Sequence, residues 1–276
     1  MTRALVAAAG ALAAVMALSC GHAATTPPRA MHAALPAPFA LHLVVPWKDS
    51  HAARLRLDDG GRPYLVTADA FVPLAHLPSG ADAKPFRIGG AATLTDAAWA
   101  DGGVMLLVVG AQLGTVDEHG FRAIADLPAP GMRVIAAGPD RCWLFAPAAG
   151  DGRLYLYDRA GTVTEVLRAP SAIQAASGTP AHAYAAIGSS IVRISERGAE
   201  LVLDGGQPIV ALAAARDTGV FFSTATGTFF LSDQRALSRL TAAGASAIEA
   251  RGDDVYFVFD GLGIVRGAPV SAFAAR

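Results

Sequence analysis

Residues Ala97–Gly110 read AAWADGGVMLLVVG: a short apolar run, a polar turn around Gly102, and a second run rich in large apolar residues. Two short strand-like runs around a glycine turn are typical of an antiparallel β-hairpin. The same plan returns four more times along the chain, in the segments Ile135–Phe145, Gln174–Ala186, Leu212–Phe222 and Ile248–Phe259. The sequence is therefore built from repeats, and each repeat begins with a hairpin.

Each repeat continues with a second pair of strand-like runs. In one of them Arg153–Tyr157 alternates polar and apolar residues, and a polar turn then leads to Val163–Leu167. A sixth, looser copy starts at Arg54–Gly61 and continues through Tyr64–Thr67. The first turns of the six copies lie 36 to 42 residues apart, at Gly60, Gly102, Asp140, Thr179, Asp217 and Asp253.

Four short strands in units of about forty residues predict an all-β fold, a single β-propeller of about six four-stranded blades. The 29 Gly and 17 Pro, with the two-residue alternation of the runs, exclude a helical solenoid of similar period. A β-sandwich stays open as an alternative. The first run of each copy is rich in Ala, which suits the innermost strand of a blade, where strands crowd around the axis.

The last copy is short and ends soon after Arg266–Gly267. Phe39–Val45, far away in the sequence, has the apolar character of a strand. We expect it to supply the missing outer strand of the last blade and so to close the ring. Closure would also remove an exposed edge.

The N-terminus has the order of a secretory signal peptide. Met1–Arg3 is a short positive start, Ala4–Leu18 is apolar, and small residues follow. An apolar run of about fifteen residues is too short for a permanent transmembrane helix. We expect residues 1–23 to direct export, with cleavage either before Cys20 or after Ala23.

The role of Cys20 decides between two forms of the exported protein, one with a lipid on Cys20 and one released by cleavage after Ala23. Leu18–Gly21 resembles a bacterial lipoprotein box, although Ala17 stands where that box usually has Leu. If Cys20 is acylated, the Pro- and Ala-rich residues 24–38 form a tether to the propeller domain, residues 39–276. We expect a periplasmic or outer-membrane location, and contact with the membrane only through a lipid on Cys20.

Composition excludes several other partners. Lys and Arg number 22 against 23 Asp and Glu, so the formal net charge of −1 gives no electrostatic reason to expect nucleic acid. Cys142 is the only cysteine after Cys20, so the mature domain has no internal disulfide. Its apolar neighbours predict a buried structural thiol rather than a catalytic one.

With these features the repeats resemble the bacterial six-bladed propellers of the NHL and gluconolactonase-like type, whose blades repeat a turn, an apolar strand, a glycine and a charged hairpin. The resemblance covers most of residues 39–270 and concerns the fold class rather than one family. It implies a divalent cation at the channel mouth, held by Glu, Asn and Asp. This chain has no Asn, so we expect no metal site and no cofactor.

Few residues outside turns and core suggest chemistry. Asp58–Asp59, Asp101 and Asp253–Asp254 lie in the predicted first turns, where Asp commonly binds backbone N–H groups. Five histidines are scattered without the spacing of metal ligands: His42, His51, His76, His119 and His182. The candidate ligand-binding residues are the polar ones that interrupt the Ala-rich first strands, since these would lie at a channel mouth: Arg56, Asp96, Arg133, Gln174 and Glu249. Solvation of strand ends is the alternative explanation.

Because no catalytic motif stands out, the sequence favours a non-enzymatic envelope propeller that acts as a scaffold for a protein partner of the cell envelope. The alternative is a lactonase-type hydrolase that uses the channel mouth, with Glu249 and Asp96 as its carboxylates. Capture of a small sugar or peptide in the channel is a third possibility. Fold alone does not decide among them.

Overall fold

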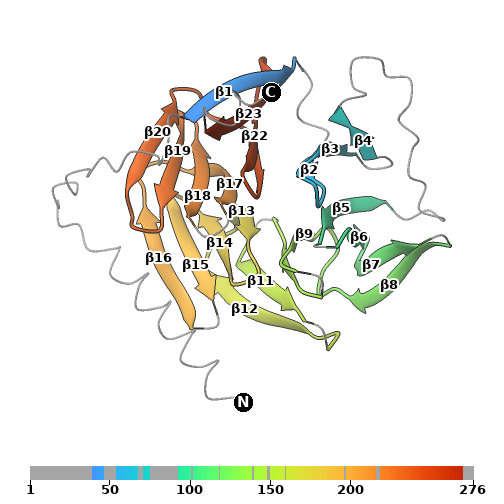
Figure 1. Ribbon diagram of the computed structural model, residues 1–276. Helices are drawn as coiled ribbons and strands as arrows, with labels where there is room; N and C mark the ends of the chain where they lie inside the picture. Colours follow the sequence, from blue (N-terminus) through green and yellow to red (C-terminus); the bar gives the residue numbers. More distant parts are fainter. Residues whose placement is uncertain are drawn as a thin grey trace.

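The protein is described by a computed structural model, and the regular elements in the part of the chain that it describes are β-strands (Figure 1). The signal peptide, Cys20 and the tether lie outside the described residues, as do Asp101, His51 and His76. The structure describes residues 39–46, 54–67, 71–74, 93–100, 102–117, 119–138, 140–147, 150–158, 160–195, 197–215 and 218–269.

The strands form six antiparallel sheets arranged around a common centre (Figure 1). The first strands lie nearest that centre: β2 (Arg54–Leu57), β5 (Leu94–Trp99), β9 (Arg133–Ala136), β13 (Ile173–Gly178), β17 (Ile209–Ala215) and β21 (Ala247–Arg251). The second strands pair with them: β3 (Pro63–Val66), β6 (Met105–Val109), β10 (Cys142–Phe145), β14 (His182–Ile187), β18 (Gly219–Thr224) and β22 (Asp254–Phe259).

Two further sets of strands complete the sheets. The third strands are β4 (Phe71–Pro73), β7 (Gln112–Asp117), β11 (Gly152–Tyr157), β15 (Ser190–Ser195), β19 (Gly227–Ser232) and β23 (Gly263–Pro269). The outer strands are β8 (Gly120–Asp126), β12 (Val163–Ala169), β16 (Gly198–Asp204), β20 (Leu237–Thr241) and, in the last sheet, β1 (Phe39–Val45). The expected propeller of four-stranded blades is confirmed.

The number of four-stranded blades was expected to be about six, and this is corrected to five. The loose first copy forms a three-stranded sheet, in the order β2-β3-β4, within the described residues. Its short strands have a local cause. Pro63 begins β3 and Pro73 ends β4, and proline has no N–H to donate to a neighbouring strand.

The expected pairing of the N-terminal strand with the last copy is confirmed. β1 runs antiparallel to β23, with Phe39 opposite Pro269 and Leu43 opposite Val265. This places the two ends of the described chain in one sheet, so the last blade depends on residues more than two hundred positions apart. Within the described residues no helix is both long and apolar enough to cross a membrane.

The core lies between neighbouring sheets, as the alternation of the strands requires. Between the last two sheets, Phe221, Phe257 and Phe259 pack against the small side chains of β17. Trp143 of one sheet packs closely against Gly178 of the next. A Cβ at position 178 would lie 2.7 Å from the indole ring, so the close packing requires glycine there. The Ala-rich first strands therefore bring the sheets close together around the centre.

Candidate functional site

The first strands of the six sheets line a central channel. A cavity of about 610 Å³ opens among their N-terminal halves and is lined by residues of all six. A second cavity of about 370 Å³ lies among their C-terminal halves. Arg56 and Glu249 line both cavities, so this pair lies between the two mouths of the channel.

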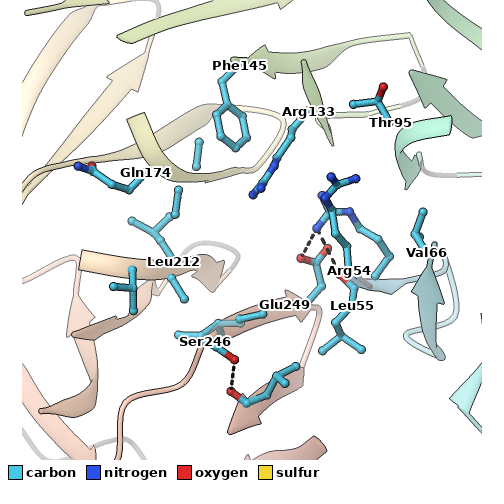
Figure 2. Close-up of a pocket in the computed structure, with 18 of the residues that line it drawn as sticks. Arg54, Leu55, Val66, Thr95, Arg133, Phe145, Gln174, Leu212, Ser246 and Glu249 are labelled. Carbon is cyan, nitrogen blue, oxygen red and sulfur yellow. Dashed lines mark hydrogen bonds and ion pairs between the residues drawn. The ribbon is translucent and has the colours of Figure 1, made fainter. Parts of the chain in front are cut away.

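All five candidate residues lie on these first strands. Arg56, Arg133, Gln174 and Glu249 line the larger cavity. Figure 2 labels Arg133, Gln174 and Glu249 among its lining residues, together with Arg54 and Phe145. Asp96 is fully buried behind Arg56. The structure thus brings the candidates together, while their role in ligand binding stays a prediction.

Arg56 is the centre of a buried ion-pair network. Its Nη2 donates to Asp96 Oδ2 at 2.7 Å and its Nη1 donates to Glu249 Oε2 at 3.2 Å. Its remaining donors reach backbone carbonyls, with Nε 2.9 Å from Ala97 O and Nη1 3.3 Å from Leu55 O. Asp96 Oδ2 also accepts the N–H of Val134 on the next sheet. Arg56 on β2 thereby binds residues of β5 and β21, and Asp96 extends the network to β9.

The network changes the ionisation of its members. Burial alone would lower the pKa of Arg56, but the charges of Asp96 and Glu249 raise it above its usual value. Burial raises the pKa of Glu249, an effect that the Arg56 charge only partly offsets. Arg56 is therefore held firmly in its charged form, whereas the protonated form of Glu249 is favoured more than in water.

Arg133 lies in the same cavity but lacks such partners. Within the described residues its guanidinium forms no ion pair, and its buried Nε has no hydrogen-bond partner. The guanidinium carbon lies 5.9 Å from the centre of the Phe145 ring, a cation–π contact that orients it. Burial, and then the nearby charge of Arg54, lowers the pKa of Arg133 below the usual range. Figure 2 shows its side chain pointing into the cavity.

Gln174 has a structural partner instead. Its Oε1 accepts the backbone N–H of Gly188 at 2.8 Å, which fixes the turn after β14.

Arg54 and Phe145 are cavity residues that the sequence interpretation missed. Arg54 could have been found, because it stands two positions before Arg56 and so faces the same side of the strand. Phe145 could not, because it comes from a second strand.

Among the acidic residues predicted to lie in first turns, Asp58 binds backbone N–H groups as expected, whereas Asp254 lies in β22. Asp58 Oδ1 accepts the backbone N–H groups of Gly60 and Arg62, at 3.0 and 2.8 Å. Asp254 pairs with Arg266 across two strands of the last sheet. These carboxylates therefore stabilise turns and strands. In the described part of the chain, no three His, Cys, Asp or Glu side chains are close enough together to hold a metal ion.

Cys142 is fully buried in β10, as predicted for a structural thiol. Burial raises the pKa of its thiol strongly, and a protonated thiol is a poor nucleophile. It packs among the apolar side chains between two sheets, beside Leu144 and Tyr155. Cys142 therefore belongs to the core.

A second feature lies at the outer rim, on β1. Leu41, Leu43 and Val44 are exposed large hydrophobic residues, and Leu43 is the most exposed of the three at 46%. β1 carries no Asp, Glu, Lys or Arg, whereas each of the outer strands β8, β12, β16 and β20 carries at least one. β1 is also the terminal strand of its sheet.

Comparison with known proteins shows the fold. No family model matches the sequence, and no curated protein matches it. Among solved structures, selenomethionine-substituted virginiamycin B lyase from Staphylococcus aureus aligns with a TM-score of 0.60 at 13% identity. The alignment covers 84% of this chain and 99% of the lyase. A catalytically inactive variant of that lyase, solved with quinupristin, gives the same values. The chain thus shares the propeller fold of these proteins.

Proposed function

We propose that this protein is a non-enzymatic propeller of the cell envelope that serves as a scaffold for a protein partner. The observation that carries the proposal is the uncharged, apolar edge of β1. Outer strands are usually protected from pairing by charged side chains, and the other four-stranded sheets follow that rule. β1 departs from it, although it lies on the rim where another protein can reach it.

The partner that fits this edge is an extended segment of another protein. β1 uses one side for its pairing with β23, and no described strand pairs with its other side. Strand addition would satisfy the backbone groups there, while alternate apolar side chains of the added strand would cover Leu41 and Leu43. The chemistry of the site therefore selects a strand with apolar residues at every second position.

The remaining features are proposed as context for this role. A closed ring of the five four-stranded sheets and the three-stranded first sheet would give a rigid disc, and this is supported by the contacts of β2 with both β5 and β21. Export through residues 1–23 would place the disc in the periplasm or at the outer membrane. A lipid on Cys20, with residues 24–38 as a tether, would keep it at the membrane surface.

The test is affinity purification from an envelope extract of the source cells with three forms of the protein. Wild type should retain a partner at stoichiometric yield, and Leu43→Lys should lose it because a charge would be placed on the apolar edge. Leu262→Lys is the matched control, since Leu262 is an exposed apolar residue in the turn between β22 and β23 rather than on β1. No stoichiometric partner, or a partner retained by Leu43→Lys, would contradict the proposal.

A hydrolase that uses the channel mouth is a second candidate, favoured by the raised pKa of Glu249. A carboxyl group with a raised pKa is a common feature of general acids. Asp96 could not act beside it directly, because it is fully buried and bound to Arg56. Lactone hydrolysis by the purified protein, lost in Glu249→Gln, would support this candidate. Absence of turnover together with no thermal shift in calcium or zinc would remove it.

A further inference from the structure

Arg133 is the feature of the channel that the fold leaves unexplained. A guanidinium has five N–H donors, and charged groups inside proteins are normally paired. Arg133 Nε is buried without a hydrogen-bond partner, and the described residues place no carboxylate within ion-pair distance of the group. Its side chain nevertheless points into a cavity of about 610 Å³, a volume typical of small-molecule sites.

The carboxylates of the channel bind Arg56 rather than Arg133, although Asp96 Oδ1 is buried without a hydrogen-bond partner. Asp96 and Glu249 both bind Arg56, and Asp96 Oδ2 accepts a backbone N–H as well. Arg54 approaches the same network only at its edge, with Nη1 3.8 Å from Asp96 Oδ1, which is an ion pair beyond hydrogen-bond distance. Three arginines thus face two carboxylates, and the positive charge in excess lies on the side of Arg54 and Arg133.

Both arginines lie on the wall of the larger cavity. The Arg133 guanidinium carbon lies 5.9 Å from the centre of the Phe145 ring, a cation–π contact that uses none of its N–H groups. Arg54 is on the adjacent part of the cavity wall, from a different sheet, and its side chain is 37% exposed. The nearby positive charge and the burial that lower the pKa of Arg133 would both be offset by an anion.

We infer that the larger mouth of the channel is a binding site for a small molecule that carries an oxyanion, a carboxylate or a phosphate, held between Arg133 and Arg54. Arginine binds both groups through paired N–H donors. Arg56 offsets part of the negative charge of Glu249 and Asp96, and with Arg54 and Arg133 the positive charges outnumber these two carboxylates. The apolar part of the wall, which includes Phe145 and Leu212, would contact the rest of the molecule. This inference goes beyond the protein-partner proposal and depends on other residues.

The test is isothermal titration calorimetry of the purified protein with inorganic phosphate and with citrate, at constant ionic strength. Wild type should bind at least one of the two saturably, and the stronger one identifies the oxyanion. Arg133→Met should bind it about tenfold or more weakly, because hydrogen bonds to a charged group are lost. Arg239→Met is a matched control, because Arg239 on the outer strand β20 also makes a cation–π contact, with its guanidinium carbon 6.0 Å from the centre of the Phe229 ring. It should bind like wild type.

A second variant decides the matter if Arg133→Met does not fold by circular dichroism. Arg54→Met removes the neighbouring donor at a more exposed position, and it should weaken binding by about threefold or more. The inference is overturned if wild type binds neither anion at millimolar concentration. It is equally overturned if the variant that folds keeps wild-type affinity.

Discussion

Two arginines of the channel lie on equivalent first strands and meet opposite environments. Arg56, in the middle of the channel, donates to two carboxylates and two backbone carbonyls. Arg133, at the larger mouth, rests on an aromatic ring and has no charged partner in the described structure. The pKa of the first is raised and that of the second is lowered. The charge in the middle of the channel therefore stabilises the fold, whereas the charge at the mouth does not.

The comparison is tested most severely by Arg56→Met. This change removes the cation hydrogen-bonded to the fully buried Asp96 and leaves only Arg54 at 3.8 Å, and breaking a buried ion pair on one side typically costs about 3–5 kcal/mol. We expect a loss of unfolding free energy of that size in urea denaturation followed by circular dichroism. The sheets joined by the network should separate more easily as a result.

Arg235→Met is the control for that experiment. Arg235 also pairs with a carboxylate, Glu200, at 2.6 Å, but its side chain is exposed. Exposed ion pairs contribute about 0–1 kcal/mol, so this variant should lose little stability. Equal losses in the two variants would show that Arg56 is no more structural than a surface residue, and the contrast drawn above would be wrong.

A smaller effect is expected from the titration of Glu249. Its folded-state pKa is raised by burial, so its contribution to stability is fully present below the unfolded pKa, about 4.3, and is lost as the pH rises through the folded pKa. Glu249→Gln removes this titration. The difference in melting temperature, variant minus wild type, should therefore increase as the pH is raised from about 4 to neutrality.

The measurement is a series of thermal melts of both proteins across that pH range in buffers of equal ionic strength. The pKa of Glu200 is lowered by Arg193 and Arg235, so its contribution to stability increases as the pH rises. This contribution is the same in both proteins and cancels in the difference. A difference that stays constant or decreases with pH would mean that Arg56 compensates the burial of Glu249 completely.

The sequence predicted the members of this channel better than their relationships. The Ala-rich first strands could be recognised from their repeat, and the polar residues in them could be assigned to the channel for the same reason. Which of these residues pair could not be predicted, because Arg56 and Glu249 are 193 positions apart and meet only when two sheets from opposite ends of the chain adjoin. The repeat period does not determine that inter-sheet register.

The first sheet shows a similar boundary between what was predictable and what was not. Its copy of the repeat could be located from Arg54–Gly61, and the pairing of Phe39–Val45 with the last copy could be expected from the missing strand there. Within the described residues this sheet has three strands, whereas the repeat predicted four. Pro63 and Pro73 lie at the ends of two of these strands, which are four and three residues long.

The smallest effect on stability is expected at the mouth itself, from Arg133→Met. The fold disfavours the charged form of Arg133, and Met keeps an unbranched side chain over Phe145 with a favourable sulfur–aromatic contact. The unfolding free energy should change by less than about 1 kcal/mol, in either direction, in the same urea experiment. Arg239→Met, which also loses hydrogen bonds to Thr226 and Thr241 carbonyls, provides the reference for an arginine over a phenylalanine. A loss near that of Arg56→Met would mean that Arg133 supports the fold through contacts of its own, which would contradict its role in binding an oxyanion.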